Sequence, residues 1–147
     1  MKKKVLATGI IAVVAAVSLC LYFKPLAFSG FIEENEKILI TAVEFEVEDG
    51  VPSLNSENFN EINDAQKSEI ISLMEDYTYH RTFGTLFSDG SLTDLGDELL
   101  QIYFFDGSDL TNTVCISSTG NISVNDRTYK MGNTSELIHR VLETVTK

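Results

Sequence analysis

The sequence predicts an α+β fold, in which an N-terminal transmembrane helix precedes an antiparallel sheet with two helices on one face. An uncharged apolar segment opens the chain, alternating apolar and polar residues then recur in short runs, and most of these runs are joined by links of hairpin length in the second half. The expected order after the first helix is β-α-β-β-β-β-β-α. Strands and helices do not alternate regularly, so a doubly wound nucleotide-binding fold is not expected.

The N-terminal segment has the length and the flanking charges of a membrane span. Val5–Phe23 comprises 19 residues without a charge, which as a helix reach across a bilayer core of about 30 Å. Lysines stand at positions 2, 3, 4 and 24, and the positive charge before the segment favours a cytoplasmic N-terminus. We therefore expect a single-pass protein of the cell membrane. The chain divides into an anchor at 1–28, a tether at 29–36 and an extracytoplasmic domain at 37–147.

Two other fates of this segment would also export the domain. Cleavage as a signal peptide at Ala27-Phe28-Ser29 would give a secreted protein. A lipoprotein would carry its lipid on Cys20, but the apolar run continues through that cysteine instead of changing to polar residues. A retained anchor is the preferred interpretation, because it accounts for the length of the segment and for the aromatic pair Tyr22-Phe23 at its outer end.

The domain begins with an alternating run at residues 37–49. One face of this expected strand carries Leu39, Thr41, Val43, Phe45 and Val47, whereas the other changes from apolar residues to Glu44, Glu46 and Glu48. The pattern predicts a long strand whose second half shows one face to water. The glutamates are interpreted as an exposed edge whose charge discourages the addition of further strands. Residues 50–63 are rich in turn formers and predict a loop.

Two later segments combine helical spacing with a capping signal. Asn63 followed by Gln66 resembles a capping box, and Asn133 followed by Glu136 predicts a second one. The apolar stripe of the first helix is Ile70, Leu73, Met74 and Tyr77, and that of the second is Leu137, Ile138, Val141, Leu142 and Val145. Both helices therefore have one face to bury against the sheet.

Five strands are expected between these two helices. They are residues 79–87, 99–109, 112–118, 122–124 and 127–131. The first is interrupted or bulged at Gly84. The last two flank a tight turn at Asn125-Asp126, which is typical of a hairpin.

The part of the chain beyond the anchor is strongly acidic. The formal net charge of the whole chain is −11. Four of the 11 basic residues precede the first acidic residue, Glu33, so the part from Ser29 onward has 7 basic and 22 acidic residues and a charge of −15. Such a charge repels phosphates, and nucleic-acid binding is therefore not expected. It attracts cationic partners over distances that salt controls.

Familiar catalytic motifs do not occur in this sequence. The serines do not lie in G-x-S-x-G or S-x-x-K, and there is no G-x-x-x-x-G-K-[ST] loop for phosphate. The histidines, His80 and His139, lack companions at the spacing of zinc ligands. We expect no cofactor, and the sequence does not favour an enzyme.

Carboxylates gather between residues 89 and 109. The candidates for a weak metal site are Asp89, Asp94, Asp97, Asp106 and Asp109. Their oxygens suit a hard cation such as Ca²⁺, but the sixth position counted from Asp89 is Asp94, where the calcium-binding loop has glycine. A solvated acidic loop is the simpler interpretation.

Aromatic residues indicate a second kind of candidate site. Tyr103, Phe104 and Phe105 are consecutive, so at least one of them points away from the helices if the segment is a strand. The candidate patch comprises Phe83, Phe87, Tyr103, Phe105 and Tyr129. Such a patch could bind a peptide or a sugar. The alternative is that these side chains fill the core.

Four segments carry a resemblance to a known group of proteins. They are the MKKK anchor, the strand pair LLQIYFFDG and TNTVCISSTG, the NISVNDRTYKM hairpin and the closing SELIHRVLETV helix. In this pattern the chain resembles small exported domains of Gram-positive-type bacteria that are held at the membrane by a single span or a lipid. The resemblance implies export and an α+β fold, and it carries over no functional residues.

Two functions remain open. The first is a membrane-tethered, acidic interaction module that binds a protein partner, cationic in character, at the outer face of the membrane. The alternative is a cell-envelope domain that binds or hydrolyses a ligand through the acidic segment 89–109. The missing motifs and the charge of −15 beyond the anchor favour the first.

Overall fold

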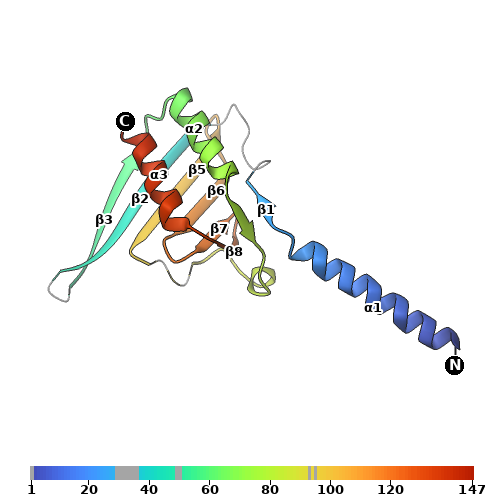
Figure 1. Ribbon diagram of the computed structural model, residues 1–147. Helices are drawn as coiled ribbons and strands as arrows, with labels where there is room; N and C mark the ends of the chain where they lie inside the picture. Colours follow the sequence, from blue (N-terminus) through green and yellow to red (C-terminus); the bar gives the residue numbers. More distant parts are fainter. Residues whose placement is uncertain (1, 29–36, 49–50, 93, 95) are drawn as a thin grey trace.

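A computed structural model of the chain shows a long helix that projects from an α+β domain (Figure 1). Residues 2–28, 37–48, 51–92, 94 and 96–147 are described, and among these the side chains of 2–9, 47–48 and 51–52 are not. The tether predicted at 29–36 lies outside the described residues.

The described elements form one antiparallel sheet with helices. The helices are α1 (Lys2–Tyr22), α2 (Asp64–Glu75) and α3 (Thr134–Val145), with a 3₁₀ helix, η1, at Gly84–Leu86. The strands are β1 (Leu26–Ala27), β2 (Lys37–Glu48), β3 (Val51–Phe59), β4 (Thr78–His80), β5 (Glu98–Asp106), β6 (Asp109–Ser117), β7 (Asn121–Val124) and β8 (Arg127–Met131). The strand order is β1-β4-β8-β7-β6-β5-β2-β3. We call the two sides of this sheet the β3 edge and the β1 edge.

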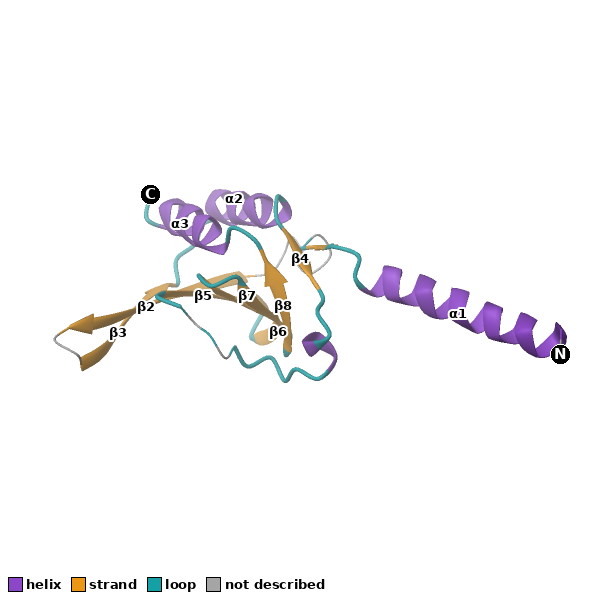
Figure 2. Ribbon diagram, turned by 60° about the horizontal axis from the view of Figure 1, so that its bottom comes forward, coloured by secondary structure: helices purple, strands orange, loops and turns teal. Residues whose placement is uncertain are grey.

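The core lies between the sheet and two of the helices. Figure 2 shows α2 and α3 on one side of the sheet and the segment between β4 and β5 on the other. Alternate residues of neighbouring strands are in register on the helix side, for example Ile40 opposite Ile102 and Ile102 opposite Val114, and all three are fully buried. The predicted α+β class, the antiparallel sheet and the two helices on one face are therefore confirmed.

The loop predicted at 50–63 is largely a strand. β3 pairs with β2 from Val51 opposite Glu48 to Phe59 opposite Ile40. Its side chains have little strand propensity. The backbone of an edge strand can still form a complete set of hydrogen bonds with a long, regular neighbour, and here that neighbour is β2. As a result β2 is an interior strand between β3 and β5, and the interpretation of its glutamates as a strand edge is wrong.

The strand predicted at 79–87 ends after His80. The next residues form η1 because two threonine hydroxyls satisfy backbone N–H groups: Thr85 Oγ1 accepts from the N–H of Thr82 at 2.9 Å, and Thr82 Oγ1 accepts from the N–H of Thr85 at 3.3 Å. Such local bonds compete with the ladder of a strand. The chain therefore leaves the sheet and crosses to the side opposite the helices (Figure 2).

One of the two predicted helix caps is present. At α2, Asn63 accepts from the N–H of Gln66 at 2.9 Å and the Gln66 side chain accepts from the N–H of Asn63 at 3.1 Å, which is the expected capping box. At α3 the prediction is wrong. Asn133 is left-handed, with φ of 56°, and its side chain makes no capping bond. Thr134 is instead buried and its hydroxyl donates to the carbonyl of Ser118.

The domain begins earlier in the chain than the boundary at 37 implied. Leu26 and Ala27 pair with β4, and Phe28 is fully buried with its ring centroid 4.9 Å from that of Tyr79. The last residues assigned to the anchor are therefore part of the sheet and core. Among the residues whose side chains the structure describes, which in α1 begin at Ile10, no helix is both long enough and apolar enough to span a bilayer.

Candidate functional site

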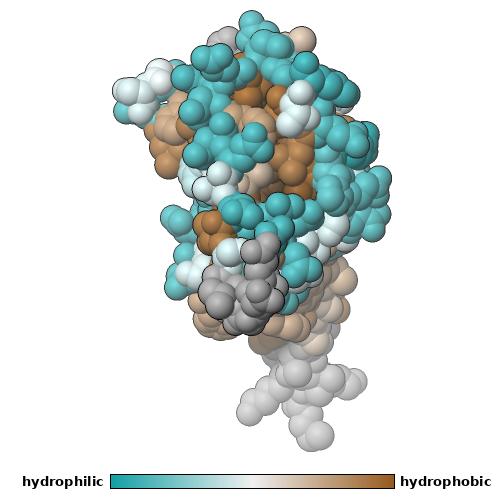
Figure 3. Space-filling view, turned by 90° about the vertical axis from the view of Figure 1, so that its left-hand side faces the viewer, coloured by the Kyte–Doolittle hydropathy of each residue, from teal (hydrophilic) through white to brown (hydrophobic). Residues whose placement is uncertain are grey.

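A groove opens at the β3 edge, between α3 and the strands β2 and β3. Figure 3 views this side of the molecule and shows apolar surface framed by hydrophilic side chains. The space measures about 260 Å³. Its lining residues are Ala42, Val43, Glu44, Asn55, Ser56, Glu57, Phe59, Glu98, Leu99, Ile138, Leu142 and Thr146. None of these residues was singled out from the sequence as a groove residue, although Glu44 was noted for its charge.

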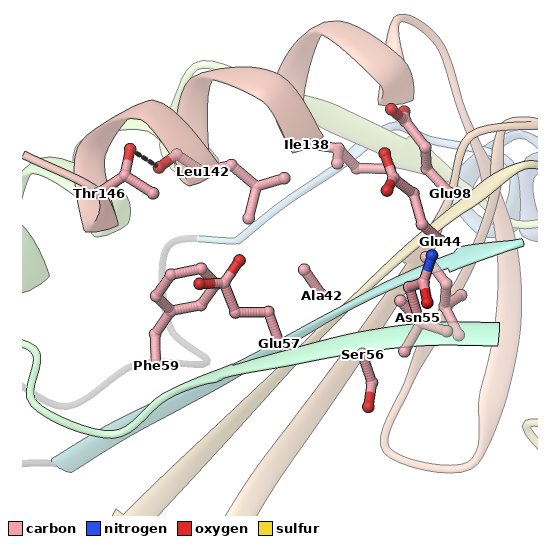
Figure 4. A pocket seen from close by; sticks show the side chains of 12 residues that line it. Ala42, Glu44, Asn55, Ser56, Glu57, Phe59, Glu98, Ile138, Leu142 and Thr146 are labelled. Carbon is pink, nitrogen blue, oxygen red and sulfur yellow. Dashed lines mark hydrogen bonds between the residues drawn. The ribbon is translucent and has the colours of Figure 1, made fainter.

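The floor of the groove is continuous with the core. Ile138 is almost fully buried, and Leu142, Ala42 and Phe59 are half-buried against the core cluster. Figure 4 shows Ile138 and Leu142 projecting from α3 toward Ala42 on β2. β2 and β3 extend past the end of the helical layer (Figure 1), so α3 covers only part of the side of these strands that faces the helices. A ligand that fills it would bury apolar surface.

Carboxylates stand over this apolar floor. Glu44 and Glu98 are directly opposite each other on neighbouring strands, and Glu57 is opposite Ala42 on the same side of the sheet. Figure 4 shows Glu44 and Glu98 together at one end of the groove and Glu57 beside Phe59. Like charges in direct cross-strand register are destabilising, so this arrangement costs stability when the groove is empty.

The charge of these carboxylates is only partly compensated. His139 Nε2 lies 3.6 Å from Glu98 Oε1, and in the part of the chain that the structure describes no lysine or arginine forms an ion pair with Glu44, Glu57 or Glu98. The carboxyl end of α3 borders the groove through Thr146, and its last turn has no basic residue. The partial negative charge of a helix C-terminus therefore adds to that of the carboxylates.

A polar hollow continues from the groove toward the β6–β7 turn. It is lined partly by Glu44, Glu46, Asp97, Glu98 and His139, and thus shares two of the groove's carboxylates. Among the described residues, however, no three histidine, cysteine or acidic side chains are placed to hold a metal ion. The site thus combines negative charge with an apolar floor.

The aspartates predicted as metal ligands do not form one cluster. Asp97 and Asp106 lie at or just beyond opposite ends of β5, a strand about 30 Å long, and Asp109 is beside Asp106 at the β5–β6 turn. The backbone carbonyl of Asp94 accepts hydrogen bonds from three side chains while its own side chain is exposed. The N–H of Ser91 donates to Asp89 Oδ1 at 3.0 Å and lowers the pKa of that carboxyl.

The aromatic side chains predicted as a patch are also separated. Tyr103 and Phe105 lie on the side of the sheet away from the helices, because Phe104 between them points to the other side and is fully buried in the core. Tyr129 is opposite the core residue Ile122 and contacts Tyr79, with ring centroids 4.9 Å apart. Phe83 and Phe87 belong to the segment around η1 and are highly exposed. The patch is thus divided between two faces and a projecting turn.

Comparisons of the chain with protein-family models, with curated proteins and with solved structures found no match. The groove and its carboxylates are accordingly the features from which a function can be argued. A sequence signal for the groove existed in one respect. The change from Ile38, Ile40 and Ala42 to Glu44 and Glu46 along one face of β2 marks the point where the helical layer ends.

Proposed function

We propose that this chain is a membrane-tethered interaction module outside the cytoplasm, and that its groove binds a cationic, partly apolar segment of a protein at the outer face of the membrane. One observation carries the proposal. Glu44 and Glu98 face each other over an apolar floor, with Glu57 near them and no described lysine or arginine to neutralise them. A positively charged segment would relieve this repulsion while its apolar side chains cover the floor.

The exposure of α1 supports its role as the membrane anchor. Its large apolar side chains from Ile10 to Leu21 are each between 49% and 69% exposed. The helix projects from the domain (Figure 1). A helix that is apolar on all sides requires an apolar environment. Val5–Phe23 is the proposed span, with its first five side chains outside the described ones.

Retention of the anchor is favoured over cleavage by the packing that follows it. Cleavage after Ser29 would remove β1 and Phe28, and Phe28 is fully buried in the core. Loss of a buried phenylalanine costs about 3–5 kcal/mol. A secreted form cut at this point would therefore be much less stable than the anchored chain.

The strength of the charge interaction can be bounded. Each exposed ion pair contributes about 0.2–1 kcal/mol, so three carboxylates together supply on the order of tenfold in affinity. The rest would come from apolar side chains on the floor. Binding should accordingly weaken with salt but not disappear.

Site-specific photocrosslinking in cells that contain the protein would test the proposal. Benzoylphenylalanine would be placed in the full-length chain at Thr146, an exposed groove residue, or at Leu110, an exposed residue of the β5–β6 hairpin. We expect one dominant protein adduct from Thr146 and none from Leu110. In a Glu57→Lys background its yield should fall about fivefold, because one attraction becomes a repulsion while Glu44 and Glu98 remain.

The matched control is Glu75→Lys, which makes the same change of charge on an exposed residue of α2 outside the groove. The adduct should survive this change. An adduct that forms equally from both probe positions, or that Glu75→Lys reduces as strongly as Glu57→Lys, would exclude the groove as the binding site. The absence of any adduct from Thr146 in an exported, folded protein would exclude the interaction module.

A further inference from the structure

A second apolar surface lies at the β1 edge, around η1. Phe83, Leu86 and Phe87 are 68%, 52% and 88% exposed, respectively. We call these three residues the η1 tip. Large apolar side chains scattered singly on a surface are ordinary, but three within five residues on one projecting turn form a patch. The groove is at the other edge of the sheet, so the η1 tip has no part in the site proposed above.

The η1 tip is held in place by hydrogen bonds with β8. Thr85 Oγ1 donates to the carbonyl of Thr128 on β8 at 2.7 Å, and Thr85 is buried. The Arg127 guanidinium donates to the carbonyls of Thr85 and Leu86, each at 3.2 Å. The turn is therefore fixed on the sheet while its apolar side chains point outward, which reduces the entropy lost when they bind.

The tip continues directly from the end of α1. The rings of Phe23 and Phe83 meet edge to face with centroids 5.0 Å apart, and the hydroxyl of Tyr22 donates to the carbonyl of Thr82 at 3.2 Å. Arg81 donates to the carbonyl of Tyr22 at 3.4 Å and lies over its ring. Figures 1 and 2 both show η1 on the side of the domain from which α1 leaves.

Three basic residues lie near the tip. Arg81 and Arg127 contact the η1 segment or its neighbour Tyr22, and Lys24 follows the aromatic pair at the end of α1. Guanidinium and ammonium groups beside apolar and aromatic side chains match the boundary of a bilayer, where lipid phosphates lie next to acyl chains. Most of the acidic surface would be repelled from the same boundary.

We propose that the η1 tip enters the outer leaflet of the bilayer that α1 spans, with Phe87 among the acyl chains and Arg81 and Arg127 at the lipid phosphates. This inference rests on the tether in the proposed function. Two attachments, α1 and the tip, fix the orientation of the domain on the membrane. The β1 edge then faces the lipid, and the groove at the β3 edge faces away from it, open to a partner.

The absence of tryptophan from the chain makes a direct test available. The F87W variant of the full-length protein would be reconstituted into vesicles of equal parts phosphatidylglycerol and phosphatidylcholine, with and without brominated acyl chains. The matched control is L54W, at a residue of β3 that is 61% exposed at the other edge of the sheet. We expect the fluorescence of F87W to shift to shorter wavelength and to be quenched by the brominated lipid about threefold more than that of L54W.

The outcomes separate this inference from the tether. If either variant fails to float with the vesicles, α1 does not anchor the chain and both proposals fall. If both variants float but F87W emits and is quenched like L54W, the tether stands and the lipid contact of the η1 tip is overturned. Restoration of the L54W behaviour in an F87W variant that also carries Phe83→Ser and Leu86→Ser would assign the contact to the tip as a whole.

Discussion

At the β3 edge of the sheet, apolar side chains line a groove whose rim is acidic; at the β1 edge, apolar side chains project from η1 beside arginines. The groove floor is buried or half-buried and continuous with the core, whereas Phe87 at the tip is 88% exposed. The two edges thus expose similar chemistry within opposite electrostatic surroundings. In the two proposals above this difference selects the partner, which is a cationic segment at the β3 edge and an anionic lipid surface at the β1 edge.

The largest loss of stability at the β1 edge is expected from a substitution of Phe28. Phe28→Ala should lower the free energy of unfolding of the domain by about 4 kcal/mol, because the side chain is fully buried against Tyr79. Phe87→Ala at the same edge should change it by less than about 0.5 kcal/mol. Urea denaturation of the full-length protein in detergent, followed by tyrosine fluorescence, measures both. Equal losses for the two variants would show that the η1 tip is packed rather than exposed.

The segment after η1 offers the next largest effect. Gly90 has φ of +84°, and a Cβ there would lie 2.6 Å from the Cα of Asp126. Gly90→Ala should therefore lower the free energy of unfolding by about 3 kcal/mol, from backbone strain and from the clash. Gly107, in the β5–β6 turn, has φ of +62° and open space around it.

Gly107→Ala is thus the matched control, with backbone strain alone and an expected loss of about 1 kcal/mol. The difference between the two alanine variants in denaturation midpoint reports how tightly the segment is held against the β7–β8 turn. If both lose the same amount, the segment yields to the new methyl group and does not fix the β1 edge.

Substitutions at the N-terminal caps of α2 and α3 should have the smallest effect on the free energy of unfolding. Gln66, in the first turn of α2, donates to the carbonyl of Thr144 at 3.1 Å, so the capping box at Asn63 supports the end of α3 that borders the groove. Asn63→Ala should cost about 1 kcal/mol, since it breaks the capping box. Asn133→Gly should leave stability unchanged within about 0.5 kcal/mol, because no capping bond is lost and φ of 56° suits glycine. Thermal unfolding followed by circular dichroism would show either result, and a larger cost at Asn133 would contradict the assigned caps.

The two asparagine caps also show how far local sequence reasoning reaches. Asn63 and Asn133 are each followed three residues later by Gln or Glu, and only the first forms the predicted capping box. At α3 the chain arrives from β8 through a tight turn, and Thr134 is drawn into a hydrogen bond with Ser118. The two helices have the same pattern of residues at their starts, but the chain enters α3 from β8 in a different direction from that in which it enters α2.

Strand pairing shows the same limit on a larger scale. The alternation along β2 and the apolar, strand-forming runs of β5 and β6 made these strands predictable, because each places apolar residues against the helices. β3 was predicted as a loop, since its turn-forming residues gave no alternation. Its existence depends on β2, which continues beyond the helical layer and offers a complete row of backbone partners.

Short-range periodicity and charge in the sequence were enough to predict the α+β class, both helices over the sheet, the hairpins of the second half and the acidic surface. The place of Phe28 in the core, the meeting of Glu44 and Glu98 over a groove and the contact of η1 with the end of α1 appear in the folded chain alone. The reason is physical. A side chain's preference for a strand, helix or turn acts over a few residues, whereas the site is made of residues up to about a hundred positions apart, brought together by strand order and packing.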